Sequence, residues 1–127
     1  MYAYYNPNPA GRMVGDCAVR AVAKALNTTW EQAYKLISNA GFNMCDMPSS
    51  DSVWGAVLRQ YGYYRAAIVS DRYSDYYTAQ MFASDHPYGT YVLGFGGHAA
   101  TIVDGVIYDA WDSSNEVPQY YWYKKEK

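Results

Sequence analysis

The stretch HAATIVDGVIYDAW, residues 98–111, carries the clearest structural signal in the chain. Two apolar runs flank Asp104-Gly105, and Asp-Gly is a favoured two-residue connection between antiparallel strands. We therefore predict a hairpin with strands over 98–103 and 106–111. Facing residues then have numbers that sum to 209, and side chains alternate across the sheet. His98, Asp109 and Trp111 are therefore expected on one face.

The remaining C-terminal half reads as further strands. Alternating and aromatic-rich runs bounded by turn residues predict strands over about 64–69, 91–95 and 119–123, and a short helix over 78–84. The N-terminal half reads as helices, which follow an irregular lead rich in Asn, Pro and Gly. Helices first and an antiparallel sheet afterwards define an α+β domain, with the N-terminal helices packed on a C-terminal antiparallel sheet.

Capping signals set the expected limits of three helices. The first runs from Cys17 to Leu26 with Asp16 as its cap, and the second runs from 30 to 40 between a Thr28–Glu31 capping box and a stop at Gly41. The third helix is opened by residues 48–50, runs through Gln60 with Tyr61 on its buried side, and ends at Gly62.

The composition excludes several classes of protein. At 127 residues the chain is one domain, residues 1–127, and its net charge of −2 gives no basic face for nucleic acid. The apolar runs are shorter than a membrane span, and the first residues lack a secretory signal. Two cysteines do not make a disulfide framework, so we expect a reduced, cytoplasmic setting. Sixteen tyrosines make the core and surface unusually aromatic.

Cys17 and His98 are the residues with the strongest chemical potential. Cys17 begins a predicted helix, where the positive end of the dipole favours a thiolate. Asp109 is a diagonal neighbour of His98 in the hairpin and within its reach, while Trp111 stands beside both. A Cys–His pair oriented by a third group is the usual arrangement for covalent acyl transfer. The backbone N–H of Cys17 is one expected oxyanion donor.

The motifs around these residues resemble papain-like cysteine peptidases. They are GDCAVRA around Cys17, GGHAA around His98 and Asp109-Ala110-Trp111, which is similar to the papain pattern Asn-x-Trp. The order Cys, His, Asp also matches, and the length is closer to minimal C39-like or NlpC/P60-like domains. The resemblance implies a papain-like fold, a triad of Cys17, His98 and Asp109, and a Trp111 that shields the bond between the last two.

Two features depart from that resemblance or add to it. Papain-like enzymes place a glutamine about six residues before the nucleophile, where this chain has Gly11, so Asn8 and Asn6 are the candidate side-chain donors to the oxyanion. The chain as a whole is also similar to small proteins of gut Firmicutes and their phages, through segments such as 46–50 and 85–87. That second similarity brings no activity with it.

The expected function is a thiol hydrolase that cleaves a peptide, isopeptide or cell-wall amide bond. Its partner is then a peptide or peptidoglycan-like substrate. The alternative is a catalytically inactive papain-like domain that binds a host or phage protein, and a third reading is a glycan-binding module built on the tyrosines. No metal or cofactor is expected, because Cys17, Cys45, His86 and His98 include no closely spaced ligand pair.

Overall fold

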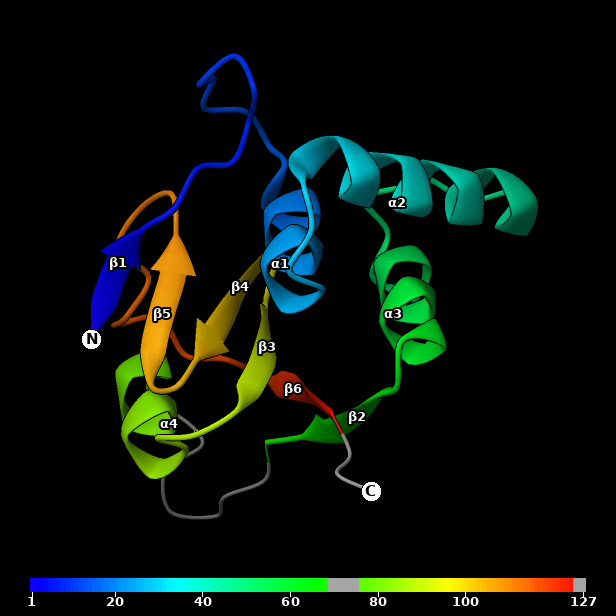
Figure 1. Ribbon diagram of the computed structural model, residues 1–127. Coiled ribbons are helices and arrows are strands. Elements are labelled where there is room, and N and C mark those ends of the chain that lie inside the picture. Colours follow the sequence, from blue (N-terminus) through cyan, green and yellow to red (C-terminus); the bar gives the residue numbers. More distant parts are fainter. Residues whose placement is uncertain (69–75, 125–127) are drawn as a thin grey trace.

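The computed structural model describes residues 1–68 and 76–124 (Figure 1). Within them the chain forms an α+β fold of helices and one sheet, as predicted. The elements in chain order are β1 (Tyr2–Tyr4), α1 (Cys17–Ala25), α2 (Trp30–Met44), α3 (Asp51–Gln60), β2 (Tyr63–Ala67), α4 (Ala79–Asp85), β3 (Thr90–Phe95), β4 (His98–Val103), β5 (Val106–Asp109) and β6 (Tyr120–Lys124).

The sheet is mixed. The prediction of a purely antiparallel sheet built from the C-terminal half is therefore wrong, because an N-terminal strand joins the sheet in parallel. Its strand order is β1-β5-β4-β3-β6-β2, and β1 pairs with β5 in parallel while the other neighbours are antiparallel. The N-terminal strand covers the open edge of β5, because Ile107 N donates to Met1 O at 2.8 Å and Tyr5 N to Asp109 O at 2.7 Å. These bonds satisfy backbone groups that an edge strand leaves unpaired.

The central hairpin forms as the sequence predicts. Val103 pairs with Val106 and Ile102 with Ile107, so the facing numbers sum to 209. Asp104 and Gly105 both have positive φ, 49° and 78°, as a two-residue turn of this hand requires. The second strand is shorter than predicted: β5 ends at Asp109, and Trp111 lies beyond it.

Two apolar cores lie on the two faces of the sheet. Figure 1 shows α1 next to the strands with α2 and α3 outside it, and α4 apart from these three. Neighbouring residues of β3 and β4 contribute to different cores: Val92 and Ala99 pack with α1–α3, whereas Leu93 and Ala100 pack with Phe82 of α4. The alternation of side chains therefore lets one sheet hold both helical layers.

Several predicted helix limits are shifted. Thr29, not Thr28, caps α2, and its partner in the capping box is Gln32 rather than Glu31. The helix continues through Gly41 to Met44. A Cβ on Gly41 would lie 2.9 Å from the carbonyl oxygen of Asp46, so this glycine permits the next loop to approach the helix closely. Cys45, rather than Gly41, is the residue that caps the C-terminus of the helix, in a left-handed conformation with a φ of 55°.

The other elements follow the predicted order with small differences. The strand expected over 64–69 is β2, and its last predicted residue, Val69, lies outside the described residues. Tyr61, expected on the buried side of α3, is 45% exposed, because the helix ends at Gln60 and the chain turns there. Across residues 1–68 and 76–124, no helix has both the length and the apolar character needed to cross a membrane.

Candidate active site

The three predicted triad residues meet where three elements begin or end. Cys17 is the first residue of α1, His98 is the first of β4, and Asp109 is the last of β5. A buried hydrogen bond from Thr101 Oγ1 to the carbonyl oxygen of Ala21, 2.7 Å long, ties α1 to β4. The helix start is thereby held against the end of the hairpin.

The carboxylate of Asp109 binds the imidazole of His98. His98 Nε2 and Asp109 Oδ2 are 2.6 Å apart. Ser113 Oγ donates to the same oxygen at 2.7 Å, and the backbone N–H of Ala110 donates to Oδ1, also at 2.7 Å. Asp109 is only 1% exposed. Burial alone would raise the pKa of its carboxyl, but the hydrogen bonds from His98 and Ser113 and the charge of His98 outweigh it, so the pKa is lowered.

The thiol of Cys17 lies close enough to the His98 ring for each group to change the pKa of the other. Burial raises the pKa of the Cys17 thiol, but the hydrogen bond and charge of His98 and the backbone N–H of Ala99 outweigh it, and the net pKa is lowered. Burial lowers the pKa of His98, yet Asp109 and Cys17 together raise it to about 9. The contact therefore favours the thiolate form of Cys17 and the imidazolium form of His98.

Two aromatic rings flank the imidazole. The Trp111 ring lies 4.7 Å from the His98 ring between centroids, and the Phe95 ring lies 5.6 Å away. The His98 side chain is 15% exposed, whereas Trp111 itself is 41% exposed. Trp111 therefore lies beside His98 although β5 ends before it, and its shielding role stays a prediction.

Arg20 and Asp16 complete the site, although neither was among the residues predicted to belong to it. Arg20 Nη2 lies 3.1 Å from Asp109 Oδ1, and its Nη1 pairs with Asp16 Oδ1. Asp16 occupies the N-cap position of α1, as predicted, but its side chain makes no capping hydrogen bond. Its second oxygen instead accepts from Trp30 Nε1 at 2.9 Å.

A signal for Arg20 does exist in the sequence. Arg20 is the charged residue in an otherwise apolar stretch, CAVRAVA, and lies four residues after Asp16 and three after Cys17. Residues at these spacings share one face of a helix. A buried arginine on the face that carries the nucleophile requires a carboxylate partner, which the structure provides in Asp109.

The side chains of these five residues form a chain in which acidic and basic groups alternate. The order is Cys17, His98, Asp109, Arg20 and Asp16, with Asp16, Arg20 and Asp109 all buried. Each charge has an opposite neighbour, which offsets the cost of removing it from water. The arrangement fixes both the protonation state and the orientation of the imidazole.

The two asparagines proposed as oxyanion donors differ in their surroundings. Asn6 Nδ2 donates to Arg12 O at 3.3 Å and Asn6 Oδ1 accepts from Asn8 N, so this side chain is used within its own loop. Asn8 lines a pocket together with Asp16 and Ala18, the residues on either side of Cys17. A role for Asn8 or Asn6 at the oxyanion stays a prediction.

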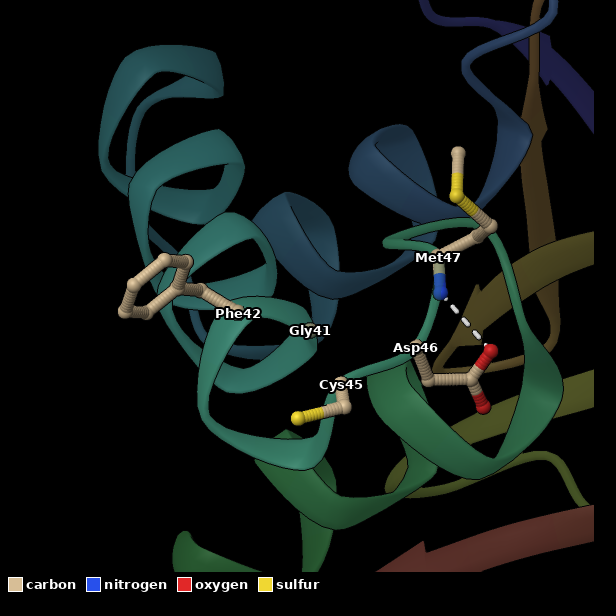
Figure 2. Close-up of a pocket in the computed structure, with 5 residues that line it drawn as sticks. All are labelled: Gly41, Phe42, Cys45, Asp46 and Met47. Carbon is tan, nitrogen blue, oxygen red and sulfur yellow. Dashed lines mark hydrogen bonds between the residues drawn. The ribbon is translucent and has the colours of Figure 1, made fainter.

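The second cysteine lies elsewhere. Cys45 is exposed at the end of α2, beside a shallow pocket lined by Gly41, Phe42, Asp46 and Met47 (Figure 2). Figure 2 shows Phe42 and Met47 projecting away from one another and Asp46 bonded to the Met47 N–H, at 2.7 Å. In the described part of the chain, no three His, Cys, Asp or Glu side chains are grouped so that they could hold a metal ion.

The chain was compared with protein-family models, with curated proteins and with solved structures, and none of them matches it.

Proposed function

We propose that the protein is a small papain-like thiol hydrolase that cleaves an amide bond in a peptide, an isopeptide or a cell-wall peptide. The observation that carries the proposal is the grouping of Cys17, His98 and Asp109, with His98 Nε2 2.6 Å from Asp109 Oδ2 and the thiol close enough to the same ring for the two side chains to shift each other's pKa. This is the geometry of a nucleophile, a base and a group that orients the base.

The reaction divides into acylation and hydrolysis. The Cys17 thiolate attacks the carbonyl carbon, and the oxyanion that forms is stabilised by the Cys17 N–H at the start of α1. His98 then gives its proton to the amide nitrogen, the C–N bond breaks, and an amine leaves a thioester on Cys17. His98, now neutral, takes a proton from water as the water attacks the thioester. The C–S bond breaks, the carboxylic acid leaves, and the Cys17–His98 pair returns to its starting state.

Asp109 and Arg20 have supporting roles in this reaction. Asp109 accepts a hydrogen bond from the Nε2–H of His98. This leaves Nδ1 as the ring nitrogen that faces the reacting groups. Arg20 neutralises Asp109 and is carried by the same helix as Cys17. The group that holds the carboxylate in place is therefore rigidly connected to the nucleophile.

Alkylation with iodoacetamide at pH 7, followed by mass mapping of the adducts, tests the activated thiol. Cys17 is expected to react faster than Cys45, although Cys45 is the more exposed of the two. His98→Ala should slow the labelling of Cys17 and leave that of Cys45 unchanged. Equal rates at the two cysteines, with no effect of His98→Ala, would contradict the proposal and favour the non-catalytic, protein-binding alternative.

A chromogenic active ester tests the covalent step. With p-nitrophenyl acetate we expect a burst of about one equivalent of p-nitrophenolate as Cys17 is acetylated. Cys45→Ala is the matched control and should keep the burst, whereas Cys17→Ala should lose it. A burst that survives in Cys17→Ala would show that another residue is the nucleophile.

A further inference from the structure

We propose that the pocket between the N-terminal lead, α1 and α2 binds an apolar substrate side chain that is followed by a carboxylate. The inference rests on the proposed function, because it assigns the substrate class of the same site. The pocket has a volume of about 420 Å³ and is lined by residues that include Arg12, Val14, Trp30, Tyr34 and Ile37. This volume is in the range of small-ligand sites.

Its position connects the pocket to Cys17. Asp16 and Ala18, the two residues that flank Cys17, both form part of the wall. The indole of Trp30, also in the wall, is bonded to Asp16. Figure 1 shows the N-terminus of α2 close to the N-terminus of α1. Cys17 is the first residue of α1. The pocket therefore lies against the first turn of α1, with one wall residue on either side of Cys17 in the chain.

The walls are apolar and partly open to solvent. Trp30 and Tyr34 stack with their ring centroids 4.9 Å apart, and Ile37 is buried behind them. Tyr34 is 50% exposed and Val14 is 38% exposed. Apolar surface that remains exposed around a concave site marks a place where an apolar group is bound. An aromatic or branched side chain of the substrate would cover this surface.

The positive charge of Arg12 at the rim of the pocket favours a carboxylate as the second part of the ligand. Asp16, the acidic residue of the wall, is already paired with Arg20. Arg12 is exposed, and within residues 1–68 and 76–124 its guanidinium makes no ion pair. An uncompensated guanidinium beside an apolar pocket complements a carboxylate, which it binds with two parallel hydrogen bonds. The ligand class is therefore an apolar residue with an adjacent carboxylate.

Four alkylating peptides separate these two contributions. They are iodoacetyl-glycyl-phenylalanine, iodoacetyl-glycyl-glycine and the carboxamides of both. Each forms a C–S bond to Cys17 and releases iodide, so the labelling rate reports how well the rest of the reagent is bound. We expect the phenylalanine acid to label Cys17 about tenfold faster than the glycine amide, with each single feature giving part of the gain.

Variants assign each preference to its residue, with every rate divided by that variant's own rate with iodoacetamide. Arg12→Gln should remove the preference for acids over carboxamides and keep the preference for phenylalanine over glycine. Tyr34→Ala should remove the preference for phenylalanine and keep the preference for acids. Lys35→Gln and Tyr61→Ala, which alter an exposed cation and an exposed tyrosine outside the pocket lining, are the matched controls and should keep both preferences. Rates within twofold for all four reagents, or equal effects of Tyr34→Ala and Tyr61→Ala, would overturn the pocket assignment.

A binding measurement without the thiol separates the pocket from the chemistry. In Cys17→Ala, N-acetyl-glycyl-phenylalanine should shift the NMR signal of the Trp30 indole N–H, and the shift should weaken when Tyr34→Ala is added. A Trp30 signal that does not move would refute the pocket, even if Cys17 is reactive. A shift at Trp30 combined with an unreactive Cys17 in the wild type would keep the pocket as a binding site and refute the hydrolase.

Discussion

Asp109 shows how one residue organises the site. Its carboxylate accepts hydrogen bonds from His98, Ser113, Arg20 and the Ala110 N–H, so both oxygens are fully used. A carboxylate bound in this way cannot rotate without breaking several bonds, and it therefore fixes the orientation of the imidazole. The sequence identified its contact with His98, but the partner on α1 emerged only from the structure.

Removing Arg20 should destabilise the fold strongly. Arg20→Met would leave Asp16 and Asp109 buried without their common cation, and breaking a buried ion pair typically costs about 3–5 kcal/mol. Urea unfolding followed by tryptophan fluorescence measures this loss. Lys35→Met, an exposed change on α2, is the control and should stay within about 0.5 kcal/mol of the wild type. A loss below about 1 kcal/mol for Arg20→Met would show that the network contributes little.

The coupling of Cys17 and His98 predicts a particular dependence of stability on pH. The pKa of His98 is raised to about 9, so its contribution is complete below pH 6.5 and is lost as the pH rises through about 9. The pKa of Cys17 is lowered from 9.0, so its contribution is complete above that value and is lost as the pH falls through the folded pKa. Between about 6.5 and 9 the contribution of His98 falls as the pH rises, whereas that of Cys17 rises above its folded pKa, so the two slopes oppose one another.

In Cys17→Ala, the pH dependence of the free energy of unfolding should show the contribution of His98 without that of Cys17. Because Asp109 still raises the pKa of His98 in this variant, the free energy of unfolding should decline as the pH rises from 6.5 towards 9. The wild type and Cys45→Ala should show a weaker decline, because the opposing slope of Cys17 is present in both. Denaturant titrations at a series of pH values measure the difference. Parallel curves for Cys17→Ala and the wild type would contradict the coupling of Cys17 and His98.

At the scale of elements, local signals were readable and distant pairings were not. The hairpin of β4 and β5 was predicted with its register, because Asp104-Gly105 fixes the geometry through adjacent residues. β1 was missed, because three residues close to Asn6-Pro7 carry little signal and gain their structure from β5, far away in the chain. A short strand of this kind is defined by its partner.

The helices show the same division. The first turn of α1 was predicted at Cys17, where the structure also begins it. The end of α2 was placed too early, because Gly41 was taken as a stop although the loop after the helix packs directly against it. Glycine serves both as a helix terminator and as a point of close approach, and only the neighbouring chain distinguishes the two.

At the scale of the molecule, the candidate site exists only when the two halves of the chain are docked. Cys17 and Arg20 come from the N-terminal helix, and His98 and Asp109 come from the C-terminal hairpin. No pair of segments that are adjacent in the chain holds the complete set. The reactivity of Cys17 should therefore depend on the intact tertiary structure.

Unfolding should remove the reactivity and the fold together. Pulse alkylation along a urea titration should show that the excess of Cys17 labelling over Cys45 labelling is lost at the same midpoint as native tryptophan fluorescence. Cys45 serves as an internal reference, because it is exposed in the folded protein. If the excess disappears well before that midpoint, the site opens locally, and if it persists beyond it, the reactivity does not arise from the docked triad.

The sequence by itself determined the α+β class, the hairpin register and the reach of Asp109 to His98, because these depend on patterns within a few residues. The tertiary structure alone decided the parallel edge strand, the contact of Arg20 with Asp109 and the pocket between the N-terminal lead, α1 and α2. Each of these joins segments separated in the chain. Such contacts depend on how whole elements pack against one another, and no local pattern encodes that packing.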